Sequence, residues 1–417
     1  MEMKKYRLAD IAEIVISSVD KKTKPGEKIV RLCNFTDVYH NWAIKQSDYD
    51  SFMVASASDS NINKLSLKKG FVAFTKDSET RDDIGISTYI ADDFDDVVLG
   101  YHCALAKPNE KIVYGKYLNA FMSSDYIKKY FELNATGSGM RFTLAVSTME
   151  NMPIMLPSLN VQKKIGDMLS DFDKRTENLR AQNRVLEQTA KTIYDYTFLQ
   201  CAGHQTTYNK TLNRNIPTNW EVKTVRDFAE LITKGTTPTT IGFNFIETGV
   251  NFVKVECIEN GKIITENLAH ISEEAHEKLR RSNLQENDIL VTIAGRLASP
   301  CVVPKSILPA NTNQAVGIIR LKKENQKYVQ YIFRCIFDPA MQNKLKGVNA
   351  QSIQKNLTLP NLGDIPIAVP DDQTLDEFNN QVTPLFQKQL VNTKQIEALT
   401  TQRNTLLPLL MTGQIEV

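Results

Sequence analysis

Cysteine pairs and long apolar runs are missing from this 417-residue sequence. Its six cysteines lie far apart, and none belongs to a C-x-x-C pair. This spacing indicates neither a disulfide framework nor a zinc ribbon, so we expect reduced, mostly buried thiols. No run of eighteen apolar residues occurs, and the first residues lack the pattern of a signal peptide. We therefore expect a cytoplasmic protein without a membrane segment.

Motifs of common enzymes are also missing. Gly115-Lys116 and Gly261-Lys262 are not followed by Ser or Thr, so neither ends a phosphate-binding P-loop. The five histidines are scattered and form no H-E-x-x-H motif. Gly137–Arg141 is rich in glycine but does not continue as G-x-G-x-x-G, so we expect an exposed loop there. The segment closest to the Asn/Asp-Pro-Pro-aromatic loop of amino-methyltransferases, Asp338–Met341, lacks the second proline and the aromatic residue. The sequence therefore predicts no catalytic, cofactor or metal site in this chain.

The composition is that of a folded protein with more than one domain. Hydrophobic residues make up 42% and charged residues 24% of the chain, and 417 residues favour two or three domains. The net charge is only +2, but residues 206–360 hold 20 Lys and Arg against 14 Asp and Glu, an excess of six. That segment is the best candidate for a surface facing phosphates. The acidic run at residues 92–96 should point away from any phosphate backbone.

The two halves of the sequence repeat one another, and the repeat decides the architecture. Residues 29–38 resemble 252–261, residues 67–75 align with 284–292, and Lys116-Tyr117-Leu118 matches Lys327-Tyr328-Val329. Residues 152–157 match 365–370 with the same Pro-x-x-x-Pro spacing. The chain is therefore predicted to consist of one unit present twice.

A heptad-like pattern follows each Pro-x-x-x-Pro element. Apolar and some polar residues recur at alternating spacings of four and three, as in the seam of a coiled coil. Pro384 interrupts the second pattern, and with Thr383 as N-cap it is predicted to begin a new helix. The strongest seam positions are Ile165, Leu169, Phe172, Leu179, Leu186, Ile193, Leu385, Ile396, Leu399 and Leu406.

Two arrangements of these helices are compatible with the pattern. Each helix could pack only on its own globular domain, or the two seams could bury each other. We favour the pairing, which should be antiparallel because a globular domain lies between the helices and lets the chain turn back. Polar residues at Asn183, Gln389, Asn392 and Arg403 would then fix the register at some cost in stability.

The predicted fold is α+β, with two globular α/β domains joined by two long helices in an antiparallel coiled coil and an internal pseudo-twofold repeat. The first globular domain covers residues 1–157 and the first long helix residues 158–202. The second globular domain covers 203–365 and the second helical region 366–417. A duplicated chain of this kind suits two similar partners or two half-sites.

The order of these features resembles the specificity subunits of type I restriction-modification systems over essentially the whole chain. The residues that carry the resemblance are Ile216–Trp220, Gly235–Pro238, the two Pro-x-x-x-Pro elements and the ending Gln402–Gly413. The sequence departs from the family's usual sequence pattern where the helices begin, at Asn160–Ile165 and Asp371–Gln373. Each motif is weak alone, but the duplicated order is specific.

The resemblance implies a function and a set of partners. Two target-recognition domains would each read half of a split double-stranded DNA site, held by helices that also bind two methyltransferase subunits. Those subunits would carry S-adenosylmethionine and the adenine-N6 chemistry, so this chain would bind no cofactor and catalyse nothing. A translocating restriction endonuclease subunit would complete the complex, although the sequence leaves open whether one exists here.

DNA-reading side chains are expected in polar loops, because Arg and Lys suit guanine, Asn and Gln suit adenine, and basic or hydroxyl groups suit phosphate. A solvated turn is the alternative for each cluster. Arg141 and Arg296 stand out because each lies close to a glycine, where the backbone can approach DNA. The predicted DNA-binding residues are Lys76, Ser78, Thr80, Arg81, Ser138 and Arg141 in the first domain, and Lys234, Thr236, Thr237, Arg296, Asn311, Asn313, Gln314, Asn349, Gln351 and Ser352 in the second.

Two other functions remain compatible with the sequence. A self-sufficient bipartite DNA-binding regulator would recruit no enzyme, and a methyltransferase gene next to this one would argue against it. An interaction scaffold without nucleic acid would show no salt-dependent DNA binding even with its partners present.

Overall fold

The computed structural model describes residues 2–139, 141–347 and 356–417. Contacts between residues divide the chain into two compact units. Unit 1 contains Met1–Gln182 and Val391–Val417, and unit 2 contains Asn183–Leu390. Each unit therefore holds one predicted globular domain and part of both long helices. The domain boundaries given above follow sequence elements rather than contacts and stay predictions.

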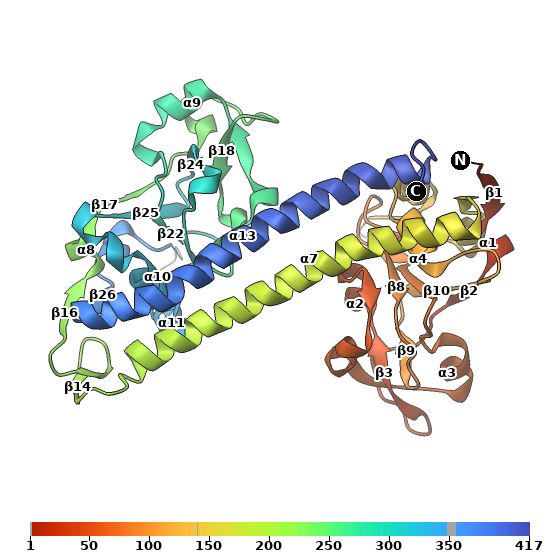
Figure 1. The fold of residues 1–417 in the computed structure, drawn as a ribbon, viewed down its shortest axis with the longest axis horizontal. Coiled ribbons are helices and arrows are strands. Elements are labelled where there is room, and N and C mark those ends of the chain that lie inside the picture. The colour runs from red at the N-terminus through yellow and green to blue at the C-terminus, as the bar shows by residue number, and fades with distance from the viewer. Residues whose placement is uncertain (1, 140, 348–355) are drawn as a thin grey trace. The chain divides into compact units, whose positions relative to one another are not determined.

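A five-stranded central sheet with the order β2-β10-β6-β8-β4 lies at the core of unit 1; Figure 1 labels β2, β8 and β10 of this sheet. Every residue of β6 and β8 is buried, which explains why the sequence of β6 reads as a continuous apolar run instead of alternating. The bounds are β2 Ala12–Ile16, β4 Ala43–Ile44, β6 Val72–Thr75, β8 Ser87–Ile90 and β10 Cys103–Pro108.

Three smaller sheets complete unit 1. In the sheet β5-β3-β9, β3 pairs antiparallel with β5 and parallel with β9. The sheets β1-β13 and β11-β12-β7 are antiparallel. The strands are β1 Lys4–Arg7, β3 Lys28–Cys33, β5 Met53–Ala57, β7 Asp77–Ser78, β9 Val97–Leu99, β11 Thr136–Ser138, β12 Arg141–Thr143 and β13 Pro153–Leu156. The short helices are α1 Leu8–Ile11, α2 Phe35–His40, α3 Asp59–Leu65, α4 Gly115–Met122, α5 Asp125–Asn134 and α6 Val146–Glu150.

Unit 2 repeats this plan with a central sheet of order β17-β25-β22-β23. In its second sheet, β18 pairs antiparallel with β21 and parallel with β24, as β3 does with β5 and β9. The strands are β14 Thr206–Asn209, β15 Arg214–Pro217, β16 Glu221–Thr224, β17 Ala229–Lys234, β18 Val250–Val253, β19 Ile258–Glu259, β20 Lys262–Ile263, β21 Ala269–Ile271, β22 Ile289–Thr292, β23 Pro300–Val302, β24 Ala310–Thr312, β25 Val316–Leu321 and β26 Pro366–Val369. The helices are α8 Val225–Phe228, α9 Glu273–Lys278, α10 Val329–Phe337, α11 Pro339–Gly347 and α12 Leu359–Gly363.

The internal repeat is confirmed, but two of the sequence matches are wrong by three residues. The Tyr117 hydroxyl donates to the Met155 carbonyl (2.7 Å), and the Tyr331 hydroxyl donates to the Ala368 carbonyl (2.6 Å). Tyr117 therefore corresponds to Tyr331 and not to Tyr328. In a helix, a shift of three residues is close to one turn, so the apolar pattern hardly changes and cannot fix the register.

The second wrong match concerns β3 and β18. Cys33 pairs with Leu99 and Val253 with Thr312 at the equivalent ends of these strands. Cys33 therefore corresponds to Val253, whereas the sequence match placed it opposite Glu256. Short strands carry too few side chains to distinguish neighbouring registers. The other two matches, residues 67–75 with 284–292 and 152–157 with 365–370, agree with the strand pairing.

Two long helices carry the predicted seam: α7 (Leu159–Tyr194), which continues as a π-helical turn to Leu199, and α13 (Asp372–Met411). In unit 1, Asp173 of α7 accepts from Arg403 (3.1 Å), and Gln182 accepts from Asn392 (3.4 Å). The residue numbers rise along α7 while they fall along α13, so the helices pair antiparallel, as predicted (Figure 1).

All ten predicted seam positions are buried or half-buried. In unit 1, Ile165 and Leu169 share a hydrophobic cluster with Leu406 and Leu410. In unit 2, Ile193 and Leu385 pack against one cluster, which also contains domain residues. The two arrangements weighed from the sequence therefore coexist, because the helices pair with each other and also enter the cores of the units.

The helix start predicted at Pro384 is wrong, because α13 runs without a break from Asp372 to Met411. Pro384 has no N–H group to donate to the carbonyl of Asn380. Both residues are exposed, so water can satisfy that carbonyl, and the buried Val382 and Gln389 on either side hold the helix in place.

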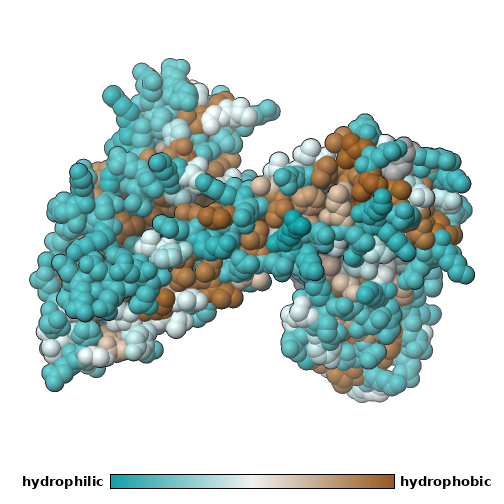
Figure 2. Space-filling view, viewed as in Figure 1, coloured by the Kyte–Doolittle hydropathy of each residue, from teal (hydrophilic) through white to brown (hydrophobic). Residues whose placement is uncertain are grey.

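The visible surface in Figure 2 is mostly hydrophilic, with separate hydrophobic patches. Some of the exposed apolar residues lie on the long helices, among them Val185 and Leu390. All six cysteines are buried free thiols. Across the described residues, no helix combines the length and apolar character needed to cross a membrane.

Candidate nucleic-acid interface

Three loops meet at one edge of the central sheet in unit 1. Strand β6 ends at Thr75 opposite the start of β10 at Cys103, and β2 ends at Ile16 opposite Ala104. Because these strands are antiparallel, the loops after β2, after β6 and before β10 lie at the same edge. Leu144 donates its N–H to the Lys76 carbonyl (2.8 Å) and so brings the segment after α5 to this edge.

Unit 2 builds the same edge with the same backbone bonds. The loops lie after β17, after β22 and before β25, and Leu357 donates to the Ile293 carbonyl (2.9 Å), as Leu144 does to Lys76. Thr75 and Thr292 are both fully buried at the end of the central strand. The Thr75 hydroxyl accepts from the N–H of Ile86 (3.1 Å), and the Thr292 hydroxyl accepts from that of Ser299 (2.9 Å).

The small sheet β11-β12-β7 joins the two residue clusters predicted in the first domain. Ser138 pairs with Arg141, and Phe142 pairs with Ser78. The Arg81 guanidinium lies 5.1 Å from the centre of the Phe142 ring, within the range of a cation–π contact. Residues more than fifty positions apart thus form one polar surface, on which Thr80, Arg81, Ser138 and Arg141 are exposed.

Lys76 has a different role from that of an exposed phosphate contact. Its ammonium group lies 2.8 Å from the Asp77 carboxylate, and the two side chains are only 13% and 11% exposed. The His102 ring nitrogen Nδ1 lies 2.6 Å from the same carboxylate. Burial opposes the ionisation of Asp77, but hydrogen bonds from Lys76, Thr143 and His102 outweigh it and lower the Asp77 pKa.

In unit 2, Gly235 allows the loop after β17 to touch the loop before β25. A Cβ atom at Gly235 would lie 1.9 Å from the Thr312 carbonyl oxygen, so only glycine fits there. Thr236 donates its N–H to that carbonyl (3.1 Å), and the Thr237 hydroxyl donates to the Gln314 amide oxygen. The structure thus brings the predicted cluster at residues 234–237 together with that at 311–314.

Arg296 is exposed in the loop after β22, directly after Gly295 with its positive φ of 71°. Among the residues that the structure describes, its guanidinium makes one hydrogen bond, a long one from Nη1 to the Ile258 carbonyl (3.4 Å). The buried Thr292 hydroxyl donates to the Arg296 carbonyl and holds the backbone. The guanidinium can therefore leave Ile258 for a ligand without disturbing the loop.

Asn311 is a structural residue, which removes it from the proposed interface. It is fully buried in β24, and its amide group donates to the Leu279 carbonyl (3.2 Å) while its oxygen meets the His276 ring. A contact with DNA would require breaking these bonds inside the domain. By contrast, Lys234 and Gln314 are exposed, and Thr236, Thr237 and Asn313 are half-buried. Asn349, Gln351 and Ser352 lie outside the described residues.

Sequence reasoning missed some residues at these edges. His102 and the exposed Tyr101 lie in the loop before β10, and the exposed Arg281 reaches the Thr236 hydroxyl (3.4 Å). The only signal for His102 would have been its place before β10, equivalent to the amide-rich run before β25. The repeat could have pointed to it, because that run was already a candidate.

The acidic run lies at the opposite edge of the unit 1 sheet. Strand β8 starts at Ser87 beside Phe74 and ends next to Val72, so the residues that follow it are remote from the loop after β6. Asp95 pairs with Lys68 (3.5 Å), and Asp96 accepts from the Tyr49 hydroxyl (2.6 Å). The sheet therefore separates these acidic residues from the candidate interface.

Within each unit, ion pairs or a cation–π contact join the globular domain to the long helices. In unit 1, Lys45 pairs with Glu177 of α7, and Arg403 of α13 lies 4.7 Å from the Trp42 ring centre. In unit 2, Arg334 of α10 is 2% exposed and pairs with Glu187 of α7. These contacts fix each domain on its own part of the helices.

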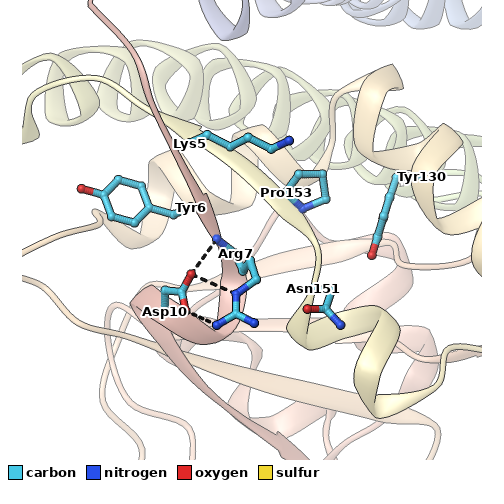
Figure 3. A pocket seen from close by; sticks show the side chains of 7 residues that line it. All are labelled: Lys5, Tyr6, Arg7, Asp10, Tyr130, Asn151 and Pro153. Carbon is cyan, nitrogen blue, oxygen red and sulfur yellow. Dashed lines mark hydrogen bonds and ion pairs between the residues drawn. The ribbon is translucent and has the colours of Figure 1, made fainter.

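Two pockets occupy equivalent places in the repeat, away from the loop edges. The first, of about 480 Å³, lies beside β1 and β13 and is lined by Lys5, Tyr6, Arg7, Asp10, Tyr130, Asn151 and Pro153 (Figure 3). The Arg7 and Asp10 side chains in it pair with each other (2.7 Å). The second lies beside β16 and β26. Within the described part of the chain, no group of three or more His, Cys, Asp or Glu residues could hold a metal ion.

Comparison with known proteins identifies the family. A family model described as the type I restriction modification DNA specificity domain matches residues 1–188 and again residues 217–406. The chain belongs to this family. The two matches cover both units, in agreement with the internal repeat.

Relatives and a solved structure agree with this assignment. The type I restriction enzyme MjaIX specificity subunit of Methanocaldococcus jannaschii is 28% identical over 321 residues, 74% of this chain and 71% of the relative. The HindI specificity subunit of Haemophilus influenzae is 22% identical over 475 residues, 99% of this chain and all of the relative. The crystal structure of the S subunit of a type I restriction-modification system from M. genitalium shares the fold, with a TM-score of 0.59, 15% identity and coverage of 98% and 96%.

Proposed function

We propose that this chain is a non-catalytic specificity subunit that reads a split double-stranded DNA site, with one half-site read by each unit. The proposal rests on one observation: in both units, three loops meet at one edge of the central sheet. Both units hold three loops and a fourth segment with equivalent backbone bonds, but the side chains on the two edges differ. A shared framework with different polar groups is what reading two different half-sites requires.

Partner subunits would supply the chemistry. Two methyltransferase subunits would bind S-adenosylmethionine and transfer its methyl group to adenine N6, and restriction subunits would act at the same sites. The names of the relatives support this assignment, because both are specificity subunits of type I restriction enzymes. The contribution of this chain is to bind DNA and to position those partners.

The test is to map methylated adenines in cells that produce this chain together with its methyltransferase. We expect a split motif with a nonspecific spacer. Replacing residues 206–360 with the corresponding domain of a relative should change one half-site and leave the other unaltered, because each unit has its own core and loops. A simultaneous change of both half-sites would contradict independent reading by the two units.

A self-sufficient DNA-binding regulator is the alternative to this function. It predicts that the purified chain alone binds its site with full specificity. We expect the chain alone to bind DNA weakly. Exposed apolar residues on the long helices, such as Val185 and Leu390, would be covered by partner subunits in the complex. Binding assays at several salt concentrations, with and without methyltransferase, distinguish the two functions.

A further inference from the structure

His102 has an unusual backbone conformation at the loop edge of unit 1. Its φ angle is +74°, in the left-handed region, which residues other than glycine adopt uncommonly and where Asn, Asp and His are the enriched exceptions. Such a conformation persists only where the surrounding structure enforces it, often at functional sites. The contacts of the imidazole show what holds His102 in this conformation.

A buried carboxylate holds this imidazole in place. His102 Nδ1 lies 2.6 Å from the Asp77 carboxylate, which also accepts from the Lys76 ammonium group at 2.8 Å. Lys76 and His102 thus meet the same oxygen, Oδ2, of this carboxylate. The Tyr101 ring packs edge-on against it, with ring centres 4.1 Å apart.

The remaining ring nitrogen is available to a ligand. When Nδ1–H donates to Asp77, the neutral ring carries a lone pair on Nε2, which can only accept. The His102 side chain is 32% exposed, and within the described residues no hydrogen bond to Nε2 is present. The structure thus offers one oriented acceptor at the edge that carries Arg81 and Arg141.

The second unit shows that the fold does not require this imidazole. Lys76 donates its N–H to the His102 carbonyl (2.9 Å), and at the equivalent place Ile293 donates to the Ala315 carbonyl (2.8 Å). The same backbone bond therefore forms with apolar side chains. The polar trio of Lys76, Asp77 and His102 is an addition specific to unit 1.

We propose that His102 reads one base of the half-site bound by unit 1, by accepting a hydrogen bond through Nε2 from the exocyclic amino group of adenine or cytosine. Asp77 is the positioning residue that fixes the ring. In the major groove only these two bases present an amino donor. This inference rests on the proposed function and deepens it, because it assigns a specificity-determining residue.

The first experiment compares methylation motifs of complexes that contain the wild-type chain, His102→Gly or Asp77→Asn. Glycine adopts a positive φ without strain and carries no hydrogen-bonding side chain, so His102→Gly removes the proposed acceptor without adding backbone strain. We expect discrimination at one base pair of the unit 1 half-site to fall about tenfold, with the other half-site unchanged. Asp77→Asn should relax the same base pair, and Asp77→Glu should restore part of the discrimination. His40→Asn, at an exposed histidine of the same unit, should leave the motif unchanged.

The second experiment removes the amino group from the DNA. Duplexes carry purine in place of one adenine, or 2-pyrimidinone in place of one cytosine, at each position of the half-site in turn. The wild-type complex should methylate one such duplex about tenfold less efficiently than the normal duplex. The His102→Gly complex should methylate these two duplexes equally well. If His102→Gly instead lowers methylation at all sequences alike, or leaves every base preference intact, the inference is wrong. A wild-type complex that produces no split motif would instead refute the proposed function itself.

Discussion

The ion pair between Arg334 and Glu187 gives the sharpest test of how a recognition domain is held on its helix. The Arg334 guanidinium is almost completely buried, and its Nη2 lies 3.1 Å from Glu187 Oε2. It also lies 5.1 Å from the ring centre of Phe386 on α13. The substitution Glu187→Gln keeps the shape of the side chain but removes the charge that compensates Arg334.

The expected loss in free energy of unfolding follows from the burial of the ion pair. Removing one partner of a buried ion pair costs about 3–5 kcal/mol, because the other charge stays buried without compensation. Glu187 is 26% exposed, so we expect the lower end, about 3 kcal/mol. With a urea dependence of about 2 kcal/mol per molar, the unfolding midpoint of unit 2 should fall by roughly 1.5 M. The double replacement Glu187→Leu with Arg334→Met should cost far less than the sum of its single replacements, because no charge is left buried.

The two tryptophans make the assay specific to each unit. Trp220 is buried in the core of unit 2, and Trp42 lies in unit 1. In a Trp42→Phe background, fluorescence during urea unfolding reports on unit 2 alone. A Trp220→Phe background is the control, in which Glu187→Gln should leave the transition almost unchanged. If the single replacements add to within about 0.5 kcal/mol, the pair is not coupled and this account of the junction fails.

Three further substitutions test other parts of the structure. Arg296→Ala should relax one base pair of the unit 2 half-site, at a cost on the order of 1–3 kcal/mol in binding; uniform weakening at all sequences would make Arg296 a phosphate contact instead. Gly235→Ala should destabilise unit 2 by about 1–3 kcal/mol in the Trp220 unfolding assay, because the added Cβ would clash with the Thr312 carbonyl. Gly347→Ala is the control: open space surrounds this glycine, so the free energy of unfolding should stay within about 1 kcal/mol of the wild-type value. Pro384→Ala should raise the stability of unit 2 by about 1–3 kcal/mol, since it restores a helical N–H donor at an exposed position; a loss of stability would show that the proline ring makes a packing contact.

Periodic features could be predicted from the sequence, because each is fixed by local side-chain patterns. The seam positions from Ile165 to Leu406 recur at alternating spacings of four and three residues, which is typical of a coiled coil. All ten are buried or half-buried in the structure. The duplication, the buried strand ending at Thr75 and the Pro-x-x-x-Pro elements were equally visible. Registers within short helices and strands could not be predicted. A shift of three residues preserves the apolar pattern of a helix, and a short strand carries too few side chains to fix its register.

The candidate interface could be predicted from the sequence to a smaller extent than these periodic features, because tertiary structure decides which loops meet. The sequence identified polar loops, and strand pairing then brought residues 76–81 next to 138–141 and residues 234–237 next to 311–314. Asn311 belonged to a promising amide-rich run, but its burial in β24 decides that its hydrogen bonds stay inside the domain.

The sequence by itself determined the duplication, the long antiparallel helices and which residues belong to polar loops, because repeated segments and hydrophobic period can be recognised from the order of residues along the chain. Only the tertiary structure decided which loops share an edge, that α13 continues through Pro384, and that Asp77 orients His102. These outcomes depend on burial and on hydrogen bonds between distant segments. Two partners of the buried Asp77 carboxylate, His102 and Thr143, come from segments far away in the sequence, and no local pattern encodes that choice.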